Sequence, residues 1–213
     1  PLVQFNSPYP SGAYLKSFFS ELGYNAHWDD LNISFFYELF SSTGIKRLFE
    51  LSESKAIKIT NQAELNNDKE TAFNLNRYIS SKEQWIKWID WIVQCLTDGN
   101  KAFSTRELSH SFLFSPFVPR GSRMEQFLST LTSTPSIDDI RFLCTLAIAD
   151  LADYITVAFD SNFRLINYST SVRYIKEKPS KIKEDLQSPI LCTFYEELLN
   201  RKYSKLDEKL LIL

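Results

Sequence analysis

The residue types that most often carry metal or redox chemistry are few in this chain and widely separated. Its 213 residues include three cysteines, Cys95, Cys144 and Cys192, and two histidines, His27 and His110. A structural zinc ion or an iron–sulfur cluster needs several such ligands at close spacing. We therefore expect no metal site in this chain. We also expect the cysteines to be buried thiols of a cytoplasmic protein, since three scattered cysteines do not suit a disulfide scaffold.

Two other groups of polar residues could bind an ion. Asp150 and Asp153 stand one helical turn apart and could offer paired carboxylates to a metal, or they could form a solvated helix face. The run RGSR at residues 120–123 could hold a phosphate between its two guanidinium groups. The alternative for that run is a solvated turn before a helix that begins near Met124.

The first 32 residues predict the elements that would position a ligand. Leu2–Phe5 is an apolar run too short for a helix and is followed by a loop with two prolines, which favours a buried strand. Apolar residues at helical spacing predict a helix over 14–22 with Gly23 as its C-terminal cap. Tyr24–Leu31 alternates loosely and predicts a second strand. Such a unit begins a right-handed crossover in a parallel sheet, where ligands lie at the carboxyl ends of the strands.

Residues 7–32, SPYPSGAYLKSFFSELGYNAHWDDLN, resemble the opening of radical S-adenosylmethionine (radical SAM) proteins whose N-terminal region is a cobalamin-binding-type domain. Shared features are the Pro-Tyr-Pro loop after a strand, the Ala-Tyr-Leu-Lys helix start and a second strand ending in Asp-Leu. The resemblance implies an iron–sulfur cluster and S-adenosylmethionine in the parent protein, with cobalamin as a further candidate. It also implies that the chain stops where a further strand, Lys209–Leu213, begins.

The chain departs from this family in two ways. Neither histidine stands in a D-x-H-x-x-G loop, and the cysteines form no C-x-x-x-C-x-x-C run. We therefore expect no catalysis and no cofactor in this chain alone. Any small-molecule contact is expected at the carboxyl edge of the first two strands, or else the prolines only shape a turn and Lys16 is solvated. The candidate ligand-binding residues are Pro8, Tyr9, Pro10, Ser11, Tyr14, Lys16, Asp29 and Asp30.

Most of the remaining chain shows helical periodicity. Residues 32–51 predict two short helices broken at Ser41–Gly44, and residues 52–68 predict a polar connection. Ser81 with Gln84 predicts a capping box for the next helix. That helix is expected at 81–96. Further helices are expected at 136–160, after a Ser136–Asp139 cap, and at 188–199.

Charge and composition limit the class of partner. The net charge is −2 and 44% of residues are hydrophobic, so a packed core is expected and nucleic-acid binding is not. Acidic residues in the long 136–160 helix argue against a membrane span. Partners are expected to be the remaining domains of the same chain, with self-association through the cut sheet edge.

Together these observations predict an α/β but predominantly helical fold with a partial Rossmann-like parallel sheet. The expected domains are the start of the α/β domain at 1–66, a helical region at 67–208 and the start of a further strand at 209–213. The expected role is a non-catalytic accessory domain that shapes or covers the active site of a radical SAM enzyme. The alternative is a helical protein-interaction or regulatory module with no small-molecule ligand.

Overall fold

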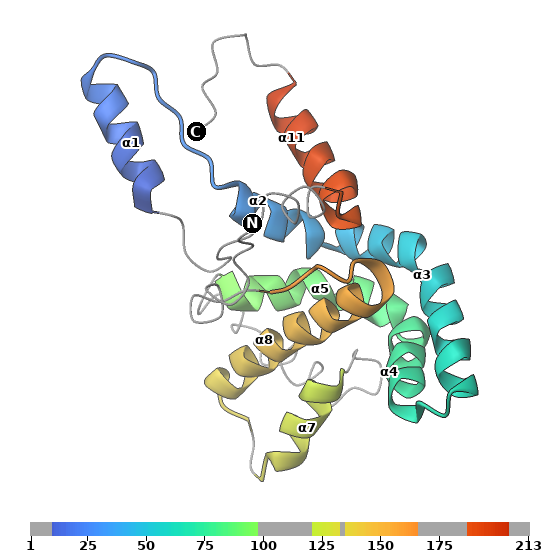
Figure 1. Cartoon of the computed structure of the whole chain (residues 1–213). Coiled ribbons are helices and arrows are strands. Elements are labelled where there is room, and N and C mark those ends of the chain that lie inside the picture. The colour runs from blue at the N-terminus through green and yellow to red at the C-terminus, as the bar shows by residue number, and fades with distance from the viewer. Residues whose placement is uncertain (1–9, 98–120, 133–134, 166–186, 205–213) are drawn as a thin grey trace. The chain divides into compact units, whose positions relative to one another are not determined.

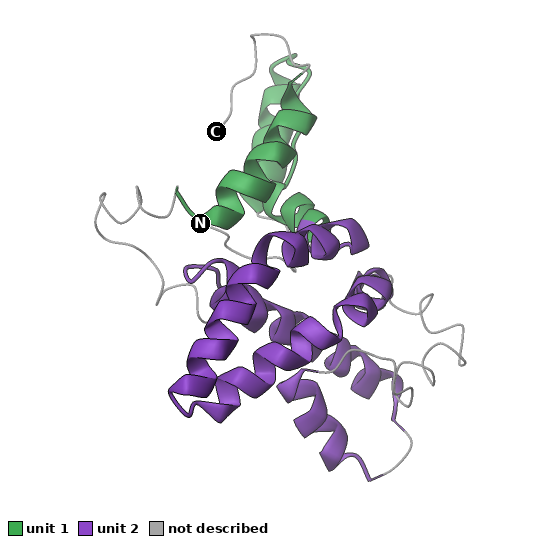
Figure 2. Cartoon of the chain, turned by 90° about the vertical axis from the view of Figure 1, so that its right-hand side faces the viewer, with its two compact units in different colours: residues 1–38, 165–213 green, residues 39–164 purple. Residues whose placement is uncertain are grey.

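The computed structural model describes residues 10–97, 121–132, 135–165 and 187–204 (Figure 1). They divide into two compact units, one from residues 1–38 and 165–213 and one from residues 39–164 (Figure 2). The first unit holds α1 (Pro10–Glu21), α2 (Leu31–Leu39), the π-helix η3 (Leu191–Tyr195) and α11 (Glu196–Tyr203). The second holds α3 (Ser42–Leu65), α4 (Lys69–Ser80), α5 (Lys82–Thr97), α7 (Ser122–Thr130), α8 (Ile137–Tyr154) and the π-helix η1 (Ile155–Phe159).

The predominantly helical character is confirmed, but the expected Rossmann-like parallel sheet is wrong: the described residues contain helices and no strand. Tyr24–Asp30, most of the second expected strand, is irregular backbone. Its end is a helix start, because the Asp30 carboxylate accepts the backbone N–H of Asn32 at 3.0 Å and that of Ile33 at 3.1 Å. The other expected strands, Leu2–Phe5 and Lys209–Leu213, lie outside the described residues, and the expected domain limits stay predictions.

Helix α3 overturns the expected polar connection over residues 52–68, because it runs unbroken through Leu65. The expected break is confirmed at Ser41, which caps α3 by accepting the N–H of Gly44 at 3.0 Å, but Ser42–Gly44 are already helical and the second helix is long rather than short. Small side chains spaced three or four residues apart give α3 a narrow buried stripe, which lets other helices approach closely and leaves its polar residues facing outward. Helices α4 and α5 and the π-helix η1 pack against α3. The small residues of the stripe are Ser52, Ala56, Thr60 and Ala63.

The junction of α4 and α5 uses Ser81 in an unexpected way. Its hydroxyl donates to the carbonyl of Arg77 at 2.7 Å, so the side chain serves the end of α4. The backbone carbonyl of Ser81 accepts the N–H of Gln84 at 3.0 Å and that of Trp85 at 3.1 Å. The predicted Ser81–Gln84 capping box is therefore wrong, although the predicted helix is confirmed as α5.

An aromatic cluster lies at the centre of the 39–164 unit. The ring of Tyr154 lies 4.9 Å from that of Phe49 and 5.2 Å from that of Tyr78, and Tyr78 stacks on Trp85 at 5.9 Å. All four side chains are almost completely buried, which stabilises the fold by about 1.5–3 kcal/mol for each large apolar side chain. The Tyr154 hydroxyl also shares a 2.8 Å hydrogen bond with Ser52, and burial raises the pKa of Tyr154 to about 12.

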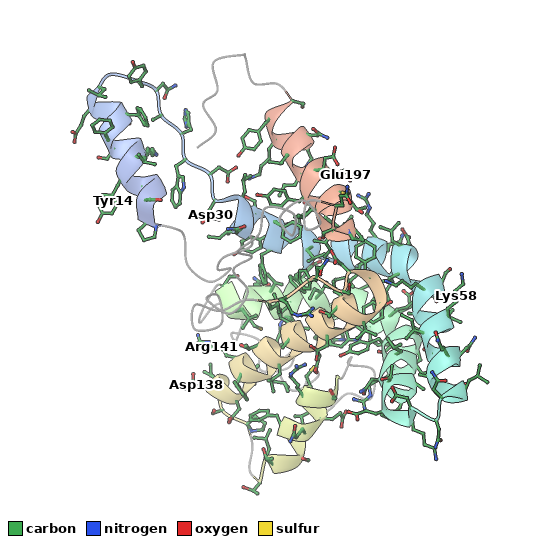
Figure 3. All side chains as sticks on the ribbon, viewed as in Figure 1. Tyr14, Asp30, Lys58, Asp138, Arg141 and Glu197 are labelled. Atoms are coloured by element: carbon green, nitrogen blue, oxygen red, sulfur yellow. The ribbon has the colours of Figure 1, made fainter. Side chains whose placement is uncertain are left out.

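Helix α8 begins as the sequence predicts. Ser136 and Asp139 form the reciprocal capping box, and Arg141 pairs with Asp138 at 3.7 Å on the outer face (Figure 3). The helix continues into η1, and Ile137–Phe159 together are long and apolar enough to cross a membrane. However, 56% of the apolar window is buried inside the protein, and α8 packs against α5 and α7. This is compatible with the core helix of a soluble protein.

The unit formed by residues 1–38 and 165–213 is held by contacts between α2 and the last helical segment. Phe35 lies 5.5 Å from Tyr195, measured between ring centroids. Arg201 binds both carboxylate oxygens of Glu38, at 3.1 and 2.6 Å. The helix predicted over 188–199 is confirmed, with Ile190, Phe194 and Leu198 among its buried residues in agreement with the apolar pattern.

Candidate functional site

Six of the eight predicted ligand-binding residues lie within the described part of the structure. Pro10, Ser11, Tyr14 and Lys16 lie in α1, whereas Asp29 and Asp30 lie just before α2. Pro8 and Tyr9 lie outside the described residues. Asp30 is used as the α2 cap, and Tyr14 projects outward from α1 (Figure 3). The assignment of a small-molecule site to these residues stays a prediction.

Asp29 has an internal role in its unit. Its carboxylate accepts hydrogen bonds from Lys202 at 2.6 Å, Tyr203 at 2.9 Å and Ser34 at 3.2 Å. Burial works to raise the pKa of Asp29, but the hydrogen bonds from Lys202 and Tyr203 outweigh it and hold the pKa below its usual range. Asp29 therefore ties the start of α2 to the end of α11. Sequence reasoning missed this contact because nearly the whole chain length separates its partners.

The clearest exposed feature is one side of α1. Tyr14, Phe18 and Leu22 recur every four residues and are 77%, 55% and 58% exposed, and Leu15 beside them is 41% exposed. We call these four residues, of which Leu22 directly follows the helix, the aromatic face of α1. The described structure buries no residue of this helix, and Lys16 and Ser20 lie on the side opposite these residues. An apolar stripe at helical spacing normally lies against another surface.

The helix is supported locally at both ends. A Cβ on Gly12 would come within 1.9 Å of the Trp28 indole nitrogen, so the indole ring lies directly against the glycine backbone. Gly23 has φ +84°. Its N–H donates to the carbonyl of Ser20 at 3.0 Å, and the N–H of Tyr24 donates to the carbonyl of Phe19 at 3.0 Å. The predicted glycine cap is thus confirmed. The chain turns back there, which places Trp28 against the start of α1.

A second polar cluster lies inside the 39–164 unit, where α7 begins beside α8. The Asp150 carboxylate is completely buried and accepts the N–H of Arg123 at 3.2 Å and of Met124 at 3.3 Å. The Arg123 guanidinium reaches Asp150 at 3.3 Å and also pairs with Asp153. Asp150 therefore accepts the free N–H groups at the start of α7.

These contacts correct two interpretations of the sequence. Asp150 is neither half of a metal site nor part of a solvated face, because Arg123 bridges it to Asp153. Within the RGSR run, Arg123 is committed to these carboxylates, and Arg120 lies outside the described residues. The sequence spacing could have predicted that Asp150 is buried. Asp150 stands three residues after Ala147 and seven after Leu143, so it lies on the same side of α8 as these two buried residues.

The electrostatics of the cluster suit a structural role. Burial raises the pKa of Asp150 above its usual range, and the hydrogen bonds from Met124 and Arg123 only partly oppose this. The hydrogen bond to Asp153 raises the pKa of Arg123, which stays charged. Tyr78 donates its hydroxyl proton to the backbone carbonyl of Asp150 at 2.8 Å. The Asp150 carboxylate is completely buried and is bound by Arg123 and Met124, so it holds α7 on α8.

The other candidate sites in the described residues are a depression on α4 and the isolated His27. A depression of ≈ 520 Å³ is lined by five residues of α4 alone, including Arg77, whose guanidinium lies 4.8 Å from the ring centre of Phe73. Within the described ranges no three Cys, His, Asp or Glu side chains gather to hold a metal ion. His27 is exposed in the irregular segment before α2, with no sheet in the described part of the chain to carry a corrinoid beside it.

The cysteines differ in burial. Cys95 and Cys144 are buried as predicted, whereas Cys192, which was also predicted to be buried, is exposed. Comparison with known proteins adds no relative: no family model, curated protein or solved structure matches the chain. The aromatic face of α1 is therefore the candidate functional site, and its chemistry is that of a surface that binds apolar side chains.

Proposed function

We propose that this chain is a non-catalytic helical module of a cytoplasmic protein and that it binds another protein surface through the aromatic face of α1. The observation that carries the proposal is the large exposed fraction of Tyr14, Phe18 and Leu22 on one side of a helix with no buried residue. Scattered exposed apolar residues are ordinary, but four on one helical stripe form a docking surface. Aromatic residues are common among those that dominate binding energy.

For the partner we propose the catalytic part of a radical SAM iron–sulfur enzyme. This choice rests on the resemblance of residues 7–32, since the aromatic face lies within that run. The iron–sulfur cluster and S-adenosylmethionine would belong to the partner, and the module would cover or shape its active site. The second candidate is a regulatory module with an unrelated protein partner, favoured by the purely helical character of the described residues.

Binding of this chain to the separately produced catalytic region, measured by isothermal titration calorimetry, tests the proposal. The double variant Tyr14→Gln and Phe18→Gln removes the two aromatic rings but keeps good helix formers. A matched variant, Lys16→Gln and Ser20→Gln, changes the opposite side. Burial of one aromatic ring contributes about 1.5–3 kcal/mol, so the first variant should weaken binding at least tenfold, roughly, while the second keeps it.

The outcomes separate the two parts of the proposal. Equal binding by both variants, with circular dichroism showing intact helices, would refute the docking role of the aromatic face. Failure of the unchanged chain to bind the catalytic region would refute the enzyme as partner and leave the second candidate. Tight binding lost only in the aromatic variant supports both parts.

A further inference from the structure

Arg77 carries a buried hydrogen-bond donor that the described part of the chain does not use. It lies in the last turn of α4, and its Nη1 atom is buried without an acceptor among the described residues. The backbone there is held firmly, because the Arg77 carbonyl accepts the hydroxyl of Ser81 at 2.7 Å and that of Ser80 at 3.1 Å. Buried polar groups are almost always paired in folded proteins, so an unpaired guanidinium nitrogen indicates a partner from outside the chain.

The same guanidinium lines the depression of ≈ 520 Å³ on α4. Phe73, Asn76, Arg77 and Ser80 stand at positions i, i+3, i+4 and i+7, so they share one side of the helix, and Ile79 completes the lining. This side faces away from the residues that α4 buries in the core. The volume falls within the range of about 300–1,000 Å³ that is typical of small-molecule sites.

The lining combines one cation with apolar surface. The Cζ atom of Arg77 lies 4.8 Å from the ring centre of Phe73, a cation–π contact that holds the plane of the guanidinium. The Phe73 ring is 62% exposed, and Ile79 adds aliphatic surface. A guanidinium presents a fork of N–H donors that matches the two oxygens of a carboxylate. The apolar walls add affinity only for a ligand that also has an apolar part.

We propose that this depression binds a small organic carboxylate whose charged group pairs with Arg77 and whose apolar part lies against Phe73 and Ile79. The carboxylate supplies the acceptor that Nη1 lacks among the described residues. The side-chain amide of Asn76, which also lines the depression, is a second donor for it. This site lies in the 39–164 unit and the aromatic face of α1 lies in the other unit, so the inference is independent of the protein partner proposed above.

An NMR titration of the full isotope-labelled chain with phenylbutyrate tests the proposal. Phenylbutanol is the matched ligand, because it has the same apolar body and no charge. We expect saturable shifts of the backbone amide signals of residues 73–80 with phenylbutyrate. Loss of a charge-assisted hydrogen bond should make phenylbutanol bind roughly tenfold more weakly or worse. Inorganic phosphate, which is charged but has no apolar body, should also bind roughly tenfold more weakly or worse.

Variants of α4 assign the binding to Arg77. Arg77→Gln should weaken phenylbutyrate binding by roughly tenfold or more and leave phenylbutanol binding within about twofold. Lys69→Gln is the matched control, because it removes one positive charge from the same helix outside the depression, and it should keep phenylbutyrate binding. Arg77→Lys keeps the charge without the fork and should weaken binding by about threefold or more. It carries the test if circular dichroism shows that Arg77→Gln unfolds the chain.

Three results would overturn the proposal. The first is equal binding of phenylbutyrate and phenylbutanol, since the guanidinium would then have no part in recognition. The second is equal phenylbutyrate binding by the Lys69 variant and by both Arg77 variants. The third is the absence of saturable shifts at residues 73–80 with millimolar phenylbutyrate, which would mean that water is the partner of the buried nitrogen.

Discussion

Removing the buried carboxylate of Asp150 should destabilise the 39–164 unit strongly. Asp150→Ala leaves the backbone N–H groups of Arg123 and Met124 without their acceptor and takes one partner from the Arg123 guanidinium. Each buried donor left unpaired costs about 1–3 kcal/mol, and breaking a buried ion pair costs about 3–5 kcal/mol. We expect the free energy of unfolding to fall by about 3–5 kcal/mol. Asp150→Asn keeps one acceptor oxygen and should lose about 2 kcal/mol.

The pH dependence of this loss has a definite sign. Since burial raises the folded-state pKa of Asp150 above the unfolded value near 3.8, the folded protein binds the proton more tightly than the unfolded chain. The stability that Asp150 contributes is therefore fully present below pH 3.8 and decreases as pH rises through the folded pKa. The deficit of Asp150→Asn relative to the unchanged protein should be larger at pH 4 than at pH 7.

Urea unfolding followed by tryptophan fluorescence measures both effects, because Trp85, Trp88 and Trp91 all lie in α5 of the same unit. Asp153→Asn is the matched control, since Asp153 is one turn further along α8, pairs with the same Arg123 and is 54% exposed. It should cost less than about 1 kcal/mol. Equal losses for the two variants would refute the structural role of Asp150. A deficit that shrinks at pH 4 would show that Arg123 and the α7 N-terminus outweigh burial.

Three further changes probe contacts that the structure shows. Gly121→Ala should lose about 1–3 kcal/mol in urea unfolding, because the new Cβ would lie 2.0 Å from the Asp150 carboxylate; unchanged stability would contradict this close approach. Tyr78→Phe should lose about 1 kcal/mol, because the ring contacts remain while the 2.8 Å bond to the Asp150 carbonyl is lost; thermal unfolding measures it, and no loss would mean that the carbonyl finds water instead. Asp29→Asn should lose less than about 1 kcal/mol near pH 7 because the pair with Lys202 is partly exposed. Since the folded pKa of Asp29 is lowered, this loss should fade as pH falls below 3.8, and a loss that grows in acid would contradict the sign.

Several local features followed from the sequence alone. The Ser136–Asp139 capping box, the Gly23 cap and the helix over 81–96 all agree with the structure. Each depends on residues within one or two helical turns, so side-chain type and spacing are sufficient to predict it. The helical character of α1 and the apolar side that makes up the candidate site were predictable for the same reason.

Tertiary structure decided what those elements contact. An apolar stripe looks the same whether a neighbour covers it or not, so only the structure shows that α1 is exposed whereas α5 is buried. From sequence alone, a carboxylate on a helix is predicted to face solvent. Only the structure shows that the start of α7 lies against Asp150. The expected strand at Tyr24–Leu31 failed similarly, because a strand needs partner strands to supply its hydrogen bonds and the described chain places none beside it. Periodicity determines which side of an element is apolar; the partner that covers it depends on residues far away in sequence, which periodicity does not record.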